Sequence, residues 1–176
     1  MKKSIKIAVS GKSGCGNTTV SKIVAEKLGL QFINFTFRCL ARERDMSLEE
    51  ILSLAAKDDS WDREVDARQV QLARESNGCV LGSRLAIWML EEADLKVYLE
   101  ADAKTRIARI VKREGGDPET VAAFTAERDR EDTNRYQRIY NIDNNNYQFA
   151  DMVINTENLD PKEIAQMLID AAEKIR

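Results

Sequence analysis

Short apolar runs alternate along the chain with longer segments whose apolar residues recur at helical spacing. The segment 17–28 is an example, because its apolar residues fall three to four positions apart. Helices between continuously apolar strands are typical of a parallel sheet that is buried on both faces. The pattern therefore predicts one α/β domain over residues 1–176 with about five parallel strands. These strands are expected at about residues 5–9, 31–35, 79–82, 95–99 and 152–155.

Capping residues mark several of the helix ends. Gly29 ends the first helix, and Ser47-Leu48-Glu49-Glu50 is a capping box that opens another. Ser60 is expected to cap the helix that follows. Asp102 and Asp117-Pro118 open two more, because Asp is a favoured N-cap and proline fits the first helical position.

Two helical segments exceed what the strand connections need. They cover about residues 36–76 and 104–146. Both leave from the edge of the sheet where parallel strands end, and ligands bind beyond that edge. We therefore expect the two insertions to fold over a ligand as flaps.

Composition narrows the possible partners and chemistry. The net charge of −3 does not favour nucleic acid or an anionic membrane. No apolar run is long enough to cross a bilayer, and no signal peptide is visible. The cysteines are odd in number and widely spaced, at Cys15, Cys39 and Cys79. They are interpreted as reduced thiols of a cytoplasmic protein. The chain contains no histidine, so its chemistry depends on Arg, Lys, Asp and backbone amides.

A glycine-rich turn between the first strand and the first helix is the strongest candidate for a binding site. Its glycines allow a tight turn, and its amides join the helix N-terminus in an anion site. Thr18 stands where a phosphate-binding loop places its magnesium-binding hydroxyl. The turn therefore predicts a phosphate-binding site at the edge of a three-layer α/β fold. The residues of this loop are Gly11, Lys12, Ser13, Gly14, Cys15, Gly16, Asn17, Thr18 and Thr19.

The loop lacks the lysine of the usual motif, because position 17 is Asn17. Lys12, five residues earlier, is one candidate for the missing positive charge. The other interpretation of Lys12 is a solvent-exposed loop lysine, and the sequence favours neither.

Arginines gather at predicted strand ends and on predicted helix faces. Arg38 and Arg84 follow the second and third strands, at the edge where the phosphate loop opens. Arg128, Asp132 and Arg135 share one helix face. From spacing alone, that face is a solvated ion-pair ladder. The same surface interpretation is favoured for the three arginines at 106, 109 and 113.

Several segments of the chain resemble the cytidylate kinases, a family of nucleoside monophosphate kinases. The loop GKSGCGNTT resembles G-x-x-G-x-G-T-T-T of the short archaeal-type branch, which also lacks the usual lysine. FRCLARERDMSLEEI resembles FRELAKERGMSLEEF, and WDREVDARQVQLA resembles IDREIDRRQKELA. The segment from VLGSRL to VKREG resembles the family's Gly-Arg turn with its following helix, and ERDREDTNRYQRIYNID resembles its lid helix.

This resemblance implies a three-layer P-loop NTPase fold that binds ATP and Mg²⁺, with the loop residues 11–19 as the ATP-binding residues. It also implies roles that replace the ladder interpretation. Arg38 and Arg84 would hold the acceptor's monophosphate. Arg128 and Arg135 would act on the phosphates from the lid, and Asp132 would bind the acceptor sugar or order the lid. Arg109 and Arg113 match less closely, so contact with the donor nucleotide and a surface position both remain open. The insertions at 36–76 and 104–146 would be the NMP-binding and lid segments.

The implied activity is ATP-dependent phosphorylation of CMP and dCMP by a monomeric enzyme. One departure from the family is the absence of an acidic residue at Gly82, before Ser83 and Arg84, so that Thr18 and water would hold Mg²⁺. The alternatives are a related kinase with another acceptor and a non-catalytic nucleotide-binding protein. Base specificity stays open: Thr36, Asp129 and Gln69 are plausible cytosine contacts, but caps or surface positions explain each more simply.

Overall fold

Five parallel strands form a single sheet in the order β2-β3-β1-β4-β5. The computed structural model describes residues 4–175. The central position of β1 places the loop that follows it in the middle of the carboxyl edge. The predicted sheet of about five parallel strands is confirmed. Its strands are β1 (Lys6–Gly11), β2 (Gln31–Ile33), β3 (Cys79–Gly82), β4 (Leu95–Glu100) and β5 (Met152–Asn155).

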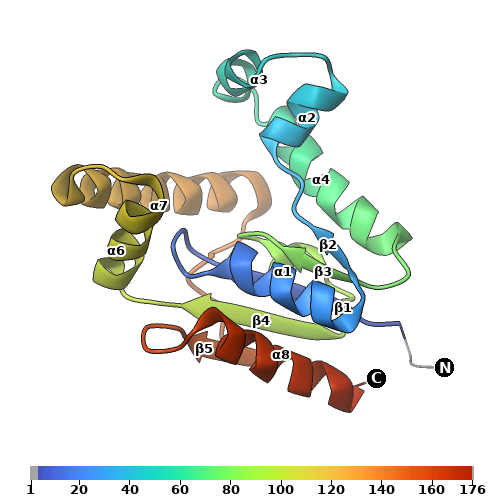
Figure 1. Cartoon of the computed structure of the whole chain (residues 1–176). Coiled ribbons are helices and arrows are strands. Elements are labelled where there is room, and N and C mark those ends of the chain that lie inside the picture. The colour runs from blue at the N-terminus through green and yellow to red at the C-terminus, as the bar shows by residue number, and fades with distance from the viewer. Residues whose placement is uncertain (1–3, 176) are drawn as a thin grey trace.

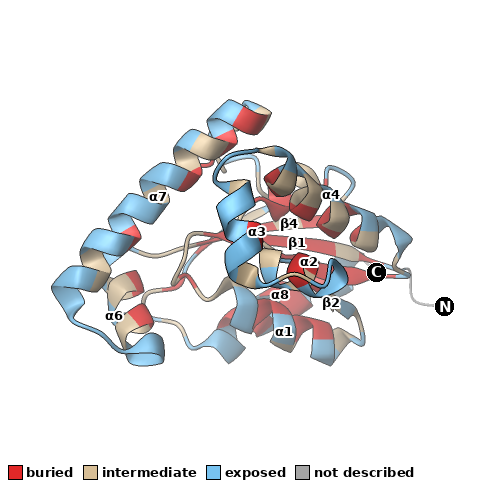
Figure 2. Cartoon of the chain, turned by 90° about the horizontal axis from the view of Figure 1, so that it is seen from above, coloured by how far each residue is buried: buried red, intermediate tan, exposed pale blue. Residues whose placement is uncertain are grey.

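Helices cover both faces of the sheet. Side chains alternate between faces along a strand, so Ile7 and Val9 pack on one side and Ala8 on the other. The first side meets α1 (Asn17–Leu28) and α8 (Pro161–Ile175), and the second meets α4 (Ser60–Glu75) and α5 (Ala86–Met89). Figure 2 shows that the central strands β1 and β4 are mostly buried. The three-layer architecture is therefore confirmed.

Two helical insertions project from the sheet on separate sides (Figure 1). The first holds α2 (Phe37–Glu43), α3 (Leu48–Ala55) and the start of α4, around a small core that includes Phe35, Leu40 and Ile51. The second holds α6 (Ala103–Glu114) and the long helix α7 (Pro118–Tyr140). Most of α7 is exposed in Figure 2. No helix within residues 4–175 is both long and apolar enough to cross a membrane.

Most predicted caps are present. Ser47 and Glu50 form both hydrogen bonds of the capping box, and Asp102 and Asp117 cap α6 and α7. The expectation for Ser60 is wrong, because α4 begins at Ser60 itself and Asp59 is the N-cap. The reason is local: the amide of Ser60 donates to Oδ1 of Asp58 at 2.9 Å, so a neighbouring side chain fills the role expected of the serine.

Candidate active site

The loop after β1 has a geometry that only glycine satisfies at several positions. Gly14 and Gly16 have φ of 86° and 92°, in the left-handed region. A Cβ at Gly11 would lie 2.7 Å from the carbonyl oxygen of Leu99. Gly16 is the N-cap of α1, and a Cβ there would meet no atom within 4 Å. The loop therefore leaves open space before the N-terminus of α1, where amides and the helix dipole favour an anion.

Side chains in the loop differ in what they can offer a nucleotide. Thr18 and Thr19 are exposed in the first turn of α1, so the hydroxyl of Thr18 is accessible to a hard cation. Cys15 is 2% exposed, and burial raises the pKa of its thiol. Its amide donates to the carbonyl of Lys12 at 3.1 Å. Cys15 thus closes the turn, and its sulfur faces the core.

Packing explains why no acidic residue stands at Gly82. A Cβ at this position would lie 2.7 Å from Oγ of Ser21 and 3.3 Å from Oδ1 of Asn17. Ser21 in turn donates to Oδ1 of Asn17 at 3.3 Å. The two polar side chains of α1 therefore occupy the space that a carboxylate on β3 would need.

The surface interpretation of the α6 arginines is wrong for two of the three. Arg106 is 6% exposed, donates to the carbonyl of Ser13 at 3.1 Å and pairs with Asp129 at 2.6 Å. Arg109 donates to the carbonyls of Gly14, at 3.2 Å, and Thr156, at 2.6 Å. Both arginines fix the phosphate loop against α6. Helical spacing could not reveal this, because the loop is more than ninety residues away in sequence.

The third arginine of that face behaves as the surface interpretation expects. Arg113 is exposed and pairs with the neighbouring Glu114 at 2.6 Å. Asp129, considered for the cytosine edge or a surface position, instead lies beside the loop through its pair with Arg106.

Asp132 joins an arginine of the sheet edge to an arginine of α7. Its Oδ2 lies 2.5 Å from Nη1 of Arg84, and its Oδ1 lies 2.7 Å from Nη2 of Arg135. Arg135 also reaches Asp62 on α4 at 3.2 Å. Asp132 is 6% exposed, so this network is a buried one and not a solvated ladder. It connects three separate elements at the carboxyl edge.

Two of the predicted arginines stand apart from this network. Arg128 is exposed and forms no ion pair within the described residues. Partial burial and the nearby charge of Arg84 lower the pKa of its guanidinium, though it stays charged. Arg38 is exposed in the first turn of α2 and is not among the residues that line the cleft described next. Arg84 and Arg135 are therefore brought together, whereas Arg128 is only near them and Arg38 remains separate.

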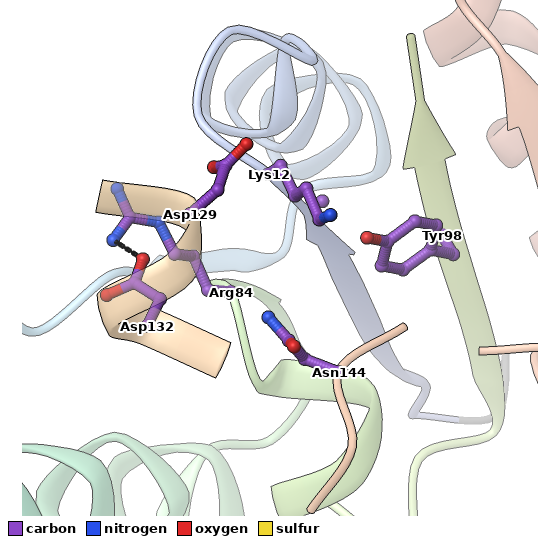
Figure 3. Close-up of a pocket in the computed structure, with 7 residues that line it drawn as sticks. Lys12, Arg84, Tyr98, Asp129, Asp132 and Asn144 are labelled. Carbon is purple, nitrogen blue, oxygen red and sulfur yellow. Dashed lines mark hydrogen bonds and ion pairs between the residues drawn. The ribbon is translucent and has the colours of Figure 1, made fainter. Parts of the chain in front are cut away.

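A small cleft opens between the loop, the sheet edge and α7 (Figure 3). Nζ of Lys12 donates to Oδ1 of Asn145 at 3.0 Å, so this lysine is held by the segment after α7. No motif singles out Tyr98 or Asn144, although the asparagine run at 144–146 is a signal that could have drawn attention to this segment. The cleft is lined by Gly11, Lys12, Arg84, Tyr98, Asp129, Asp132 and Asn144.

Comparisons with known proteins agree with this arrangement. A model of the cytidylate kinase-like family matches residues 6–158. The chain is 45% identical over 174 residues to cytidylate kinase 2 of Borreliella afzelii, covering 97% of each chain. It is 39% identical to the cytidylate kinase of Archaeoglobus fulgidus, with 96% of this chain and 95% of that one covered.

A solved structure extends the likeness to the fold. Shikimate kinase from Bacteroides thetaiotaomicron superposes with a TM-score of 0.66 at 16% identity, covering 96% of this chain and 98% of that chain. The sequence relatives span nearly the whole chain. The chain belongs to the cytidylate kinase-like family, and it is a kinase.

Proposed function

We propose that this kinase transfers the γ-phosphoryl group of ATP to CMP, and also to dCMP, forming ADP and CDP or dCDP. The observation that carries the proposal is the cleft itself, where an open glycine loop faces the Arg84–Asp132–Arg135 network. Backbone amides suit the donor's phosphates, and guanidinium groups suit a second phosphate. The names of the relatives supply the acceptor: they are cytidylate kinases.

The chemistry matches the side chains that the chain has. An oxygen of the acceptor phosphate attacks the γ-phosphorus, and the bond to the β-phosphate oxygen breaks to release ADP. That acceptor oxygen is already ionised near neutral pH, so a chain without histidine needs no general base. Catalysis then consists of positioning and charge neutralisation. Arg84 would hold the acceptor phosphate, and Arg128 and Arg135 would neutralise the transferring group.

Magnesium fits the loop through a single protein ligand. The described residues contain no cluster of carboxylates, histidines or cysteines suited to a metal. Mg²⁺ commonly keeps several waters and binds substrate phosphates with one or two protein groups. The exposed hydroxyl of Thr18 meets that requirement. Bound there, the ion would offset charge on the ATP phosphates.

Assays of ADP release with CMP, dCMP, UMP and AMP, each with ATP and Mg²⁺, test the proposal. We expect CMP and dCMP to be the best acceptors. Faster turnover of another monophosphate would favour the related-kinase alternative. Binding of ATP without turnover of any acceptor would favour a nucleotide-binding protein. We further expect the protein to be cytoplasmic, because Cys15, Cys39 and Cys79 are free thiols. We also expect a monomer, which light scattering checks.

A further inference from the structure

One face of α4 extends the arginine network away from the phosphate loop. Asp62, Asp66 and Gln69 are spaced i, i+4 and i+7, so they share this face. Asp62 pairs with Arg135 of α7 at 3.2 Å, and the hydroxyl of Tyr140 donates to Oδ2 of Asp66 at 2.6 Å. Gln69 lies about 10 Å along the helix from Asp62. These three side chains therefore extend away from the arginines proposed to bind phosphate, and the distance they cover is comparable to the length of a nucleoside monophosphate.

Gln69 has an unexplained acceptor atom. Its side chain is 6% exposed, and within the described residues Oε1 is buried without a hydrogen-bond partner. Gln69 lies in the interior of α4, so it is neither the cap nor the surface residue that the sequence favoured. Most buried polar groups are paired, because leaving one unpaired destabilises the fold. A ligand that supplies a donor would account for this one.

Asp66 fixes which way the amide of Gln69 faces. Nε2 of Gln69 lies 3.5 Å from Oδ1 of Asp66, whose other oxygen accepts from Tyr140. If the amide turned over, Oε1 would face the carboxylate, and two acceptors would oppose each other. Asp66 therefore keeps the amide nitrogen toward itself and leaves Oε1 to face a ligand.

We propose that Gln69 is a specificity-determining residue that accepts a hydrogen bond from the exocyclic amino group of the acceptor's base. Asp66 and Tyr140 act as positioning residues for its amide. The inference rests on the proposed function, since it assigns the base-binding end of the same acceptor site. Cytosine carries an amino donor at this edge, whereas uracil carries a carbonyl acceptor. With uracil bound, its carbonyl acceptor would face the acceptor Oε1 and no hydrogen bond could form. The site therefore selects the pyrimidine that carries an amino group.

Contacts between α4 and α7 close this face in the present structure. Besides Asp62 with Arg135, Arg138 pairs with Asp59 at 2.7 Å at the exposed end of the interface. The Arg138–Asp59 pair is exposed and therefore weak, whereas the Asp62–Arg135 pair and the bond from Tyr140 to Asp66 are partly buried. Opening of α7 from α4 would break these contacts to admit the base, and closure would restore them and bring Arg135 to the phosphates.

Initial rates with CMP and with UMP test the assignment. Gln69→Ala should lower kcat/KM for CMP by about tenfold or more, mainly through KM, and change UMP little. The matched control is Gln71→Ala on the same helix, because Gln71 is exposed and, among residues 4–175, its side chain hydrogen-bonds only to Arg68 and Glu75. The control should keep the wild-type ratio of CMP to UMP. An unchanged ratio in Gln69→Ala overturns the inference.

Two further variants separate recognition from folding. Gln69→Leu removes the unpaired amide, so its melting temperature should equal or exceed that of the wild type while selectivity for CMP is lost. A purely structural glutamine predicts the reverse, with a lower melting temperature and unchanged selectivity. Asp66→Asn frees the amide to turn, so UMP should gain relative to CMP. If Gln69→Ala does not fold, Gln69→Leu carries the kinetic test.

Assays of the wild-type protein separate a failure of the proposed function from a failure of the Gln69 assignment. If it phosphorylates neither CMP nor UMP, the proposed function fails and the base assignment fails with it. If it prefers CMP and the Gln69 and Asp66 variants keep that preference, only the assignment of Gln69 fails.

Discussion

Two parts of the candidate site offer positive potential to an anionic ligand, and they do so by different means. The phosphate loop, residues 11–19, is contiguous in sequence and would offer backbone amides from a turn in which Gly14 and Gly16 have positive φ. The interface between α4 and α7 uses side chains from distant segments, such as Arg84, Asp132 and Arg135. The first can therefore be recognised from a motif, whereas the second exists only when the chain is folded.

The two parts also differ in what holds them in place. The loop rests on Arg106 and Arg109, which donate to the carbonyls of Ser13 and Gly14. Its positive potential comes from dipoles that cannot be neutralised. In the interface, the carboxylate of Asp132 already bridges two arginines. A substrate phosphate bound there, as proposed, would share or take over these arginines, so that its binding would be coupled to how α7 lies against α4.

Removing arginines from α7 should have the largest effect. Arg135→Ala and Arg128→Ala should each lower kcat by about 100- to 1,000-fold, because a charge that stabilises the transferring group is lost. Steady-state assays with CMP measure this, and circular dichroism checks the fold. Arg138→Ala is the control, since Arg138 lies one turn further on and, in the described part of the chain, forms an ion pair only with Asp59. Normal turnover of the Arg128 and Arg135 variants would contradict the role of α7 in catalysis.

Distorting the loop should have the next largest effect. A Cβ at Gly14 would lie 2.8 Å from the carbonyl of Arg106 at a φ of 86°, so Gly14→Ala must displace the loop. We expect kcat/KM for ATP to fall about 100-fold, as for a small misplacement of reacting groups. Gly115→Ala is a matched control: its φ is 77°, and its Cβ would meet no atom within 4 Å. Equal losses in both variants would show that backbone strain alone is responsible.

Lys12 lies where the two regions meet, and its substitution should have a smaller effect. Its ammonium is held by Asn145 beside the cleft, so it can replace part of the charge missing at Asn17. Lys12→Ala should lower kcat by about tenfold, as expected for the loss of one charge-assisted hydrogen bond. Lys22→Ala, on the exposed face of α1, should change it little. Unaltered turnover in Lys12→Ala would leave the lysine without a catalytic role.

The sequence predicted those features that short-range patterns determine. Apolar runs located the strands, and the helix limits Asn17 and Leu28 follow from a glycine at each end. Short-range patterns did not predict the burial of Arg106, because it is buried by a loop more than ninety residues away. They did not predict the environment of Gln69 either, because the unpaired Oε1 atom is a property of the folded interior. The sequence alone therefore assigned Gln69 to a surface or a cap.

The buried interface also carries a stability cost that the loop does not, and Asp66 makes it measurable. Burial raises the pKa of its carboxyl from 3.8 to about 6, against the hydrogen bond from Tyr140. The folded state therefore binds the proton more tightly than the unfolded chain, so stability falls as pH rises from about 4 through 6. Two pH units correspond to about 3 kcal/mol at most, and solvent around this half-buried group reduces that.

Asp66→Asn replaces the carboxylate with a neutral group that still accepts from Tyr140. It should raise the free energy of unfolding by about 1–2 kcal/mol at pH 7.5 and change it little at pH 4. Denaturant titrations at both pH values measure this difference.

Asp58→Asn is a control of opposite sign. The hydrogen bond from the Ser60 amide lowers the pKa of Asp58, so the stabilising effect of this carboxylate is present near neutral pH and lost on acidification. Asp58→Asn should destabilise the protein at pH 7.5. If Asp66→Asn did the same, the ionised carboxylate of Asp66 would stabilise the fold, as that of Asp58 does. A gain at pH 7.5 with weaker discrimination of CMP from UMP would instead show that the interface gives up stability for selectivity.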